Sequence, residues 1–185
     1  MRHLLIIAAL MPLAAHADRL DDEIRTCAPM VTPSTMRAIV KVESGGNPYA
    51  INVNHGGKLR HQPRSRREAI SVAARLIRAG YDIDMGIGQI NVRNMRKFGL
   101  SVSSMFDACR NLHVAGTILL RDYEASGDVY KAVSRYNTGD SYAGFRNGYV
   151  GRVARAAGYN VPVQEHRAHV EQVADQLVVY SADNE

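Results

Sequence analysis

The chain has 185 residues, of which 46% are hydrophobic and 22% charged, with a formal net charge of +5. That length suits a single domain with a real core, and no apolar run is long enough to cross a membrane as a helix. Five of the 23 Lys and Arg residues lie in "KLRHQPRSRR", residues 58–67, which lacks the interleaved aromatic side chains of a nucleic-acid-binding surface. We therefore expect no nucleic-acid partner and a solvated basic surface, with an acidic polymer of the cell envelope as the alternative ligand.

The N-terminal residues have the three parts of a secretory signal peptide. A short basic start precedes an apolar run, residues 4–13, and the sequence "AHA" then offers a small-x-small cleavage site after Ala17. We expect residues 1–17 to be a cleaved signal, residues 18–160 to form the domain, and residues 161–185 to form a peripheral helix or a tail.

The predicted elements are mainly helical. A helix is expected over Thr35–Val42, with Ser34 or Thr35 as its N-cap. Residues 50–62 begin with alternating β-branched residues and continue with Gly, Asn and Pro, which predicts an irregular loop or a small β-hairpin.

Further along the chain, capping residues mark the helix ends. Ser65 and Glu68 form a capping-box pattern at the start of a helix that Gly80 is expected to end. The remaining helices are expected from Val92 to Phe98, from Asp107 to before Gly127, after an Asp128 cap, and from Tyr149 to Ala157.

The chain has two cysteines, Cys27 and Cys109. Export to an oxidising compartment favours a disulfide between them. The alternatives are two free thiols or a catalytic thiol, but no base or electropositive segment adjoins either position.

Three distant segments place polar groups at a helix end or a tight turn. Glu43 ends an apolar helix before "SGGNP", Gln89 follows the glycine-rich "GIG", and Tyr136-Asn137 precede a glycine. Taken singly, these patterns are typical of a surface charge, a turn and a helix C-cap.

Taken together, the segments resemble a known family. "VESGGNPYAIN", "DMGIGQIN", "CRNLHVAGTILL", "SRYNTG" and "YVGRV" follow the order and approximate spacing of the SLT-type lytic transglycosylases. The chain is similar to the small exported members associated with type IV secretion and conjugation. The resemblance covers roughly residues 27–158 and implies a mostly α, lysozyme-like (goose-type/SLT) single domain located in the periplasm.

The resemblance also implies a set of site residues. Glu43 matches the catalytic acid, and no cofactor or metal is implied. The positions that match substrate-binding or supporting residues are Ser44, Gly88, Gln89, Ile90, Tyr136 and Asn137. The chain has Ile87-Gly88 where the family more often has Leu-Met, so we expect that side of the groove to be more open or differently filled.

The chemistry accounts for the position of Glu43. Burial and the partial negative charge of a helix C-terminus both raise the pKa of a carboxyl group, so this side chain is placed to remain a proton donor near neutral pH. The family is thought to cleave peptidoglycan without water, through a 1,6-anhydro product. The machinery of type IV secretion or conjugation is the partner that this resemblance implies.

Two other functions remain open at this point. A hydrolytic muramidase would need a second carboxylate, for which Asp84 or Asp82 is available, although we expect both to be solvated loop or turn residues. A non-catalytic scaffold of a secretion machine would use the groove for assembly instead.

Two minor signals are given little weight. His166 and His169 have helical spacing for a metal but lack further ligands, so we expect solvated histidines. Tyr142, Phe145 and Tyr149 are candidates for either sugar stacking or the core.

Overall fold

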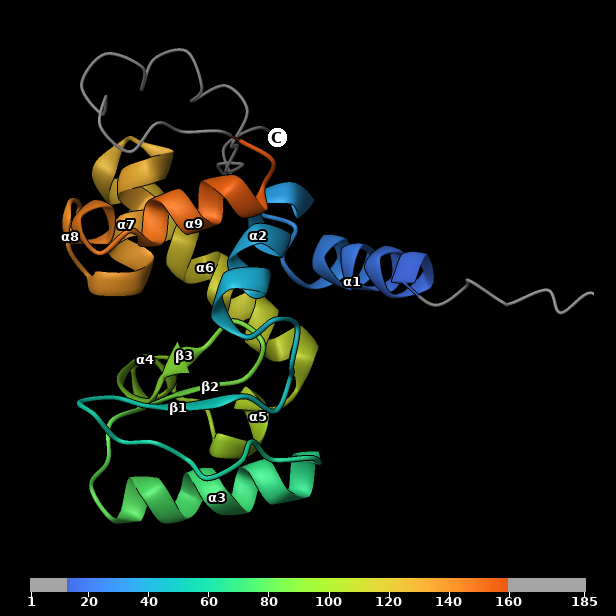
Figure 1. Cartoon of the computed structure of the whole chain (residues 1–185), viewed down its shortest axis with the longest axis vertical. Helices are drawn as coiled ribbons and strands as arrows, with labels where there is room; N and C mark the ends of the chain where they lie inside the picture. Colours follow the sequence, from blue (N-terminus) through green and yellow to red (C-terminus); the bar gives the residue numbers. More distant parts are fainter. Residues whose placement is uncertain (1–12, 160–185) are drawn as a thin grey trace, which may run out of the picture.

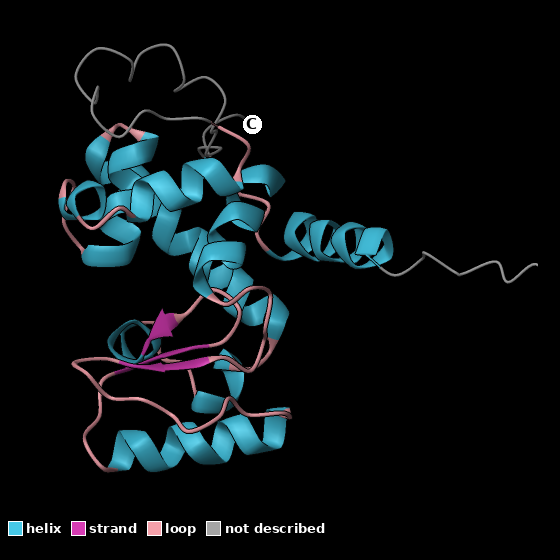
Figure 2. Ribbon diagram, viewed as in Figure 1, coloured by secondary structure: helices cyan, strands magenta, loops and turns pink. Residues whose placement is uncertain are grey.

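The structure is a computed structural model that describes residues 13–159 of the chain (Figure 1). Its helices are α1 (Leu13–Cys27), α2 (Pro33–Glu43), α3 (Arg66–Arg78), α4 (Val92–Lys97), α5 (Val102–Met105), α6 (Ala108–Ser126), α7 (Val129–Thr138), α8 (Ala143–Arg146) and α9 (Tyr149–Ala156). Its strands are β1 (Ile51–Val53), β2 (Ile83–Met85) and β3 (Ile90–Asn91). The fold is therefore mostly helical with a small sheet, as the sequence predicts, and Figure 2 shows the strands gathered in one place.

The helices and the sheet occupy two ends of the molecule. Figure 1 shows α2, α7, α8 and α9 at one end and the sheet with α3, α4 and α5 at the other, while α6 runs between them. Helix α6 packs against α1, α5, α7 and β3, and α2 packs against α1 and α9. This arrangement places the end of α2 beside the sheet.

Most predicted helix ends agree with the structure. Asp107 and Asp128 cap α6 and α7 by accepting hydrogen bonds from backbone N–H groups of the first turn. Ser65 caps α3 in the same way, and its helix ends just before Gly80.

The predicted cap of α2 is wrong. Thr32 is the N-cap residue and Pro33 occupies the first turn, so Ser34 and Thr35 already lie inside the helix. Proline suits the first helical position because its missing N–H would have no partner there. The two short helices α5 and α8 and the helix α1 were not predicted.

Residues 50–62 contribute a strand, but the partner of that strand is distant in sequence. β1 pairs antiparallel with β2, Ile51 opposite Met85 and Val53 opposite Ile83, and β2 pairs with β3. A local hairpin within 50–62 is therefore replaced by a three-stranded sheet, and the rest of the segment is irregular. Strands of two or three residues are too short to be recognised from alternation alone.

One apolar core connects the two ends. Its largest fully buried side chains come from both, and include Met36, Ile39, Met85, Ile90, Phe106, Leu112, Leu119 and Tyr149. The predicted stripe of α6 is confirmed at Leu112, Ala115 and Leu119, whereas Ala108 is only partly buried.

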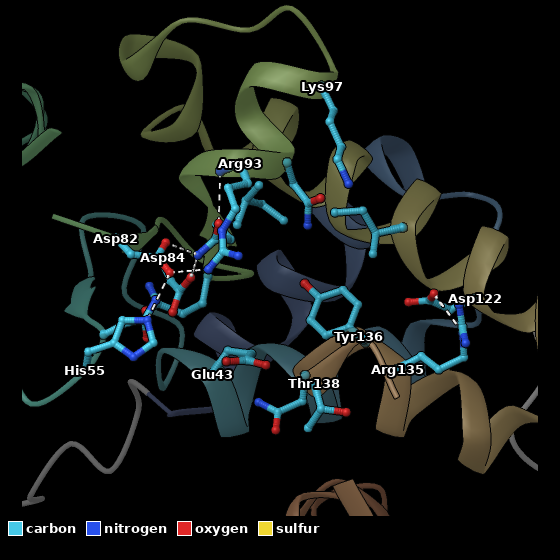
Figure 3. Close-up of a pocket in the computed structure, with 18 residues that line it drawn as sticks. Glu43, His55, Asp82, Asp84, Arg93, Lys97, Asp122, Arg135, Tyr136 and Thr138 are labelled. Atoms are coloured by element: carbon cyan, nitrogen blue, oxygen red, sulfur yellow. Dashed lines mark hydrogen bonds and ion pairs between the residues drawn. The ribbon is translucent and has the colours of Figure 1, made fainter. Parts of the chain in front are cut away.

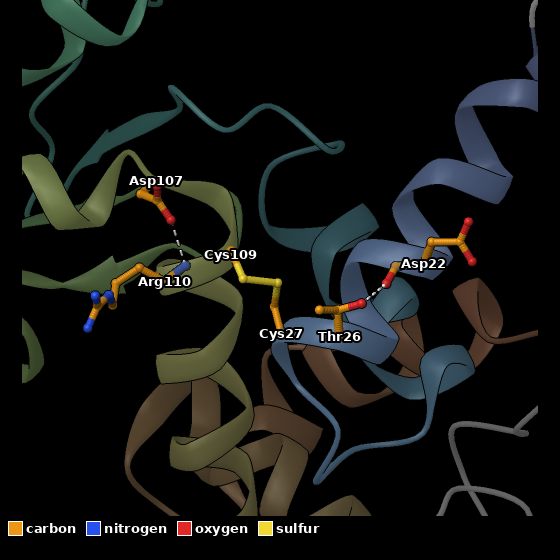
Figure 4. Close-up of a disulfide and its surroundings, with 6 residues drawn as sticks. All are labelled: Asp22, Thr26, Cys27, Asp107, Cys109 and Arg110. Atoms are coloured by element: carbon orange, nitrogen blue, oxygen red, sulfur yellow. Dashed lines mark hydrogen bonds between the residues drawn. A yellow bond between two sulfur atoms is a disulfide. The ribbon is translucent and has the colours of Figure 1, made fainter.

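A disulfide joins Cys27, at the end of α1, to Cys109, in the first turn of α6, with a Cα–Cα distance of 5.1 Å (Figure 4). The predicted pairing is thus present. The bond fixes α1 against the helix that runs between the two ends of the domain.

The predicted signal peptide and tail remain predictions. Residues 1–12 and 160–185, including His166 and His169, lie outside the described residues, and α1 runs across the predicted cleavage site at Ala17. Among the helices of the described residues, none has the length and apolar character of a membrane span.

Candidate active site

A polar groove opens beside the end of α2. Two adjoining pockets of about 620 and 590 Å³ form it, and their shared wall consists of polar side chains only: Glu43, Asn54, Asp84, Gln89 and Asn137. Figure 3 shows Glu43, Asp84 and Tyr136 around the larger pocket. Residues from α2, the sheet and α7 therefore meet at one cavity.

Glu43 is the last residue of α2, and its carboxyl group faces the groove from a mostly buried position. The hydroxyl of Tyr149 donates a 2.5 Å hydrogen bond to Oε1. Burial raises the pKa of Glu43 from its ordinary value of 4.5 to about 7. The Tyr149 hydrogen bond opposes this rise, the Asp84 charge adds to it, and Arg152 again opposes it. Near neutral pH both the protonated and the ionised form of this carboxyl group are therefore populated.

Ser44 connects the end of α2 to the glycine-rich turn of residues 86–89. Its hydroxyl donates a 2.7 Å hydrogen bond to the carbonyl of Ile87 and accepts one from the N–H of Gly46. Ser44 lines only the smaller pocket. Its contacts are those of a residue that holds the acid and the turn together.

The turn itself is held from behind by Asn111, which is fully buried on α6. Its Oδ1 accepts a hydrogen bond from the N–H of Gly88 at 2.8 Å, and its Nδ2 donates to the carbonyls of Met85 and Met105, each at 2.9 Å. The sequence pattern of this segment assigned Asn111 no role. The feature that could have identified it is a polar amide beside the apolar stripe of a helix.

Gly88 does not line either pocket. It is buried, and a Cβ there would lie 2.9 Å from the Cβ of Ala115 and 3.2 Å from the hydroxyl of Tyr136. Neighbouring side chains therefore occupy the space beside Gly88 that a larger residue would need. Of the two alternatives for this side of the groove, the structure favours a differently filled wall over a more open one. Ile87 is buried as well, at 3% exposure.

Gln89 lines both pockets. Its backbone has φ = +52°, which is unusual for a residue with a side chain. Its Nε2 donates to the carbonyls of Ala50 and Gly86 at 3.2 and 2.8 Å. These two bonds fix the amide at the wall that the two pockets share.

Tyr136 and Asn137 approach from the end of α7. The hydroxyl of Tyr136 donates a 2.7 Å hydrogen bond to the carbonyl of Gly88, and burial raises the pKa of this phenol well above its usual value. Asn137 accepts a hydrogen bond from Asn147 and lines both pockets. Ile90, on β3, lines the larger pocket.

The expectation of a solvated loop position is wrong for Asp84, whereas Asp82 lies in the loop just before β2 and is partly exposed. Asp84 lies on β2 and lines both pockets, and it accepts hydrogen bonds from Asn91 and Asn52 at 2.7 and 3.4 Å. Asp82 lines the larger pocket. Burial disfavours its ionisation, but hydrogen bonds from Asn91 and Arg93 outweigh burial, so the pKa of Asp82 is lowered.

The three aromatic candidates, Tyr142, Phe145 and Tyr149, lie in different environments. Tyr149 is buried, at 2% exposure, and bonds to Glu43, whereas Tyr142 is exposed and lies near the ammonium of Lys131. Phe145 packs against the core. None of the three lines the two pockets of the groove.

Within residues 13–159, no group of three or more His, Cys, Asp or Glu side chains is arranged to hold a metal ion.

Comparison with known proteins identifies the family of the chain. Residues 23–157 match the family described as the transglycosylase SLT domain. The chain is 40% identical over 145 residues to "Type IV secretion system protein virB1" of Brucella abortus biovar 1 (strain 9-941), covering 71% of this chain and 60% of that protein. It is 37% identical over 145 residues to "Protein virB1" of Agrobacterium fabrum (strain C58 / ATCC 33970), covering 75% of this chain and 59% of that protein.

The chain thus spans about 60% of the length of these relatives. No solved structure matches it significantly.

Proposed function

The chain belongs to the transglycosylase SLT domain family, and we propose that it is a lytic transglycosylase that cleaves the β-1,4 bond between N-acetylmuramic acid and N-acetylglucosamine in peptidoglycan. The observation that carries the proposal is the carboxyl group of Glu43, whose pKa is raised to about 7 at the floor of a polar groove. A carboxyl group with this pKa can both give and take a proton near neutral pH.

The reaction needs one residue in two roles. In its protonated form, Glu43 donates its proton to the glycosidic oxygen as the bond from that oxygen to the anomeric carbon breaks. The resulting carboxylate then accepts the proton of the muramic acid 6-hydroxyl, whose oxygen forms the new bond to the anomeric carbon. The sugar closes a 1,6-anhydro ring, no water is consumed, and Glu43 returns to its protonated form.

The neighbouring side chains support this cycle. Tyr149 donates to Oε1 and therefore favours the carboxylate form that follows the first proton transfer. Gln89 and Asn137 flank Glu43 on the shared wall of the groove, where their amides can position the N-acetyl and hydroxyl groups of the glycan. The scaffold holds these groups in place before the substrate binds, through the bonds of Ser44 and Asn111 to the turn.

The test is the mass of the products. Purified sacculi treated with the protein should release muropeptides that end in 1,6-anhydro-muramic acid and are one water lighter than hydrolysis products. Glu43→Gln should release none. Products with free reducing ends would reject the transglycosylase reaction and support the muramidase.

The muramidase remains the second candidate because of one observation. Asp84 lines both pockets with Glu43, and its charge raises the pKa of that residue. A hydrolase could use this carboxylate as nucleophile or base. The variant Asp84→Asn distinguishes the muramidase from the transglycosylase, because a hydrolase would lose its activity, whereas a transglycosylase would still form the anhydro product.

We further propose that the protein acts in the periplasm and opens the wall locally for a type IV secretion or conjugation apparatus. The support is the 40% identity to the type IV secretion system protein virB1 of Brucella abortus, together with the export signal that the sequence predicts. A non-catalytic scaffold would behave differently. Assembly of the apparatus would then survive Glu43→Gln, and wild-type protein would leave sacculi intact.

A further inference from the structure

Lys97 places a positive charge in the larger pocket. It is the last residue of α4, and Figure 3 shows its side chain extending from that helix into the cavity that Glu43 also lines. A lysine at a helix C-terminus is favourable even when it turns to solvent, because it complements the helix dipole. That effect alone does not require the ammonium group to point into the groove.

The other basic side chains of this pocket are already neutralised. Arg93 is paired with Asp82, which His55 also approaches at 3.6 Å, and Arg135 is paired with Asp122 at 3.3 Å. For Lys97, by contrast, the described residues provide neither an ion pair nor a hydrogen bond to the ammonium group. The pocket therefore has one wall with an uncompensated positive charge.

The substrate class of the proposed function contains a matching group. In a peptide-bearing strand the lactyl carboxyl of muramic acid is consumed in the amide bond to the peptide, so the sugars themselves are neutral and provide no counter-charge for an ammonium group. The negative charges of the polymer are the free carboxylates of the peptides attached to muramic acid. Only these branches can pair with a cation in a groove that binds the glycan.

We propose that Lys97 binds a carboxylate of the peptide branch and makes the groove selective for peptide-bearing strands over an uncharged glycan. This inference rests on the proposed substrate, but it does not depend on how the bond is cleaved. Asn94, three residues earlier on α4, lines the same pocket and adds an amide donor on the same face. The paired charges of Asp122 and Arg135 cancel, so that wall neither attracts nor repels the carboxylate.

The chain offers a matched control for Lys97. Arg96 precedes it on α4, is exposed, has the same charge and does not line the pocket. Replacing either residue by methionine removes one positive charge and keeps a long, unbranched, helix-favouring side chain. A difference between the two variants therefore reports the position of the charge.

The experiment measures binding in the Glu43→Gln background, so that strands stay intact. Calorimetry would compare soluble peptide-bearing strands with chito-oligosaccharides of similar length, whose sugars carry no carboxylate. Lys97→Met should weaken binding of the peptide-bearing strands about five- to tenfold, as expected for a partly exposed charged hydrogen bond, and leave binding of the chito-oligosaccharides unchanged. Arg96→Met should change neither affinity, and added salt should reduce the effect of Lys97→Met.

Two results would overturn the inference: an equal loss on both ligands, or no loss on either. Lys97→Arg keeps the charge and should bind as the parent does. The reaction type is judged separately from the product masses, so hydrolytic products would reject the transglycosylase chemistry while the difference in strand binding would still stand.

Discussion

The hydroxyl of Tyr149 and the carboxyl of Glu43 are 106 residues apart in the chain and 2.5 Å apart in the fold. The bond crosses from the first turn of α9 to the last residue of α2, two helices that pack along each other. It stabilises the carboxylate, whereas burial of the same group stabilises the acid. The proton affinity of Glu43 is set by these opposing effects.

Tyr149→Phe should move the pH dependence of cleavage upward. Without the donated hydrogen bond, the carboxylate is less stable and the pKa of Glu43 rises, so the alkaline limb of kcat/KM should shift up by roughly half a pH unit or more. Initial rates from pH 5 to 9 measure it. Tyr142→Phe, at an exposed position outside the groove, is the control and should leave the profile in place. An unchanged profile in Tyr149→Phe would mean that the bond is not made in solution.

Asp84→Asn should move the alkaline limb of kcat/KM to lower pH, opposite to the effect of Tyr149→Phe. The charge of Asp84 raises the pKa of Glu43, so its removal should lower that pKa and shift the alkaline limb to lower pH, while the product remains 1,6-anhydro. Asp22→Asn, an exposed carboxylate paired with Arg25, provides the comparison. A shift in the same direction as in Tyr149→Phe would contradict the electrostatic account.

Glu43→Gln should stabilise the protein at alkaline pH. The folded pKa of about 7 lies above the ordinary value of 4.5, so the favourable contribution of the buried acid is complete below pH 4.5 and is lost as the pH rises through 7. A glutamine avoids the buried charge, and the variant should be more stable than wild type by up to about 3 kcal/mol at pH 8 and by little at pH 4. Urea unfolding at both pH values provides the measurement. Glu124→Gln, at an exposed position, should show no such pH dependence.

Gly88→Ala should destabilise the fold by about 1–3 kcal/mol, because the new Cβ would meet the Cβ of Ala115 at 2.9 Å and Oδ1 of Asn111 at 3.1 Å. Ala115→Gly removes the closest of these contacts. The double variant should therefore be more stable than the sum of the two single changes, as a double-mutant cycle of unfolding free energies can determine. Strict additivity would argue against a shared contact at this site.

Loss of the Cys27–Cys109 disulfide should lower the free energy of unfolding by about 2–5 kcal/mol. The comparison is between wild type and a variant with serine at both positions, each unfolded in urea with and without reductant. Reductant should weaken wild type alone. Thiol titration of the unreduced, unfolded protein should find no free thiol, and two titratable thiols would exclude the bridge.

The helices could largely be predicted because their signals are local. Asp128 caps α7, and Gly80 lies just past the end of α3, because a side chain or a left-handed backbone satisfies groups within one turn of its own position. The α2 cap was misassigned because Ser34 and Thr35 are good caps in isolation, whereas Pro33 fixes the N-cap two or three residues earlier, at Thr32.

The sequence could predict that Glu43, Gln89 and Asn137 lie at one groove, but not the contacts that these residues make. Family motifs identified Glu43 and Gln89, yet the pairing of Tyr149 with the acid depends on how α9 packs on α2. Asp84 was misplaced for the same reason, since its three-residue strand is held in part by β1, whose paired residues lie 30 or more positions away. Such contacts are tertiary, and no local pattern contains them.

The three hydrogen bonds of Asn111 have a consequence for cooperativity. They join the end of β2, the turn beside Glu43 and the residue that ends α5 to the interior of α6. If any one of these segments detached, the buried amide of Asn111 would lose a hydrogen-bond partner, at a cost in free energy. Opening one segment alone therefore carries its own cost, whereas opening all three together shares one cost among them. The wall of the groove should accordingly form and melt as one unit with the central helix, rather than fluctuate as a surface loop.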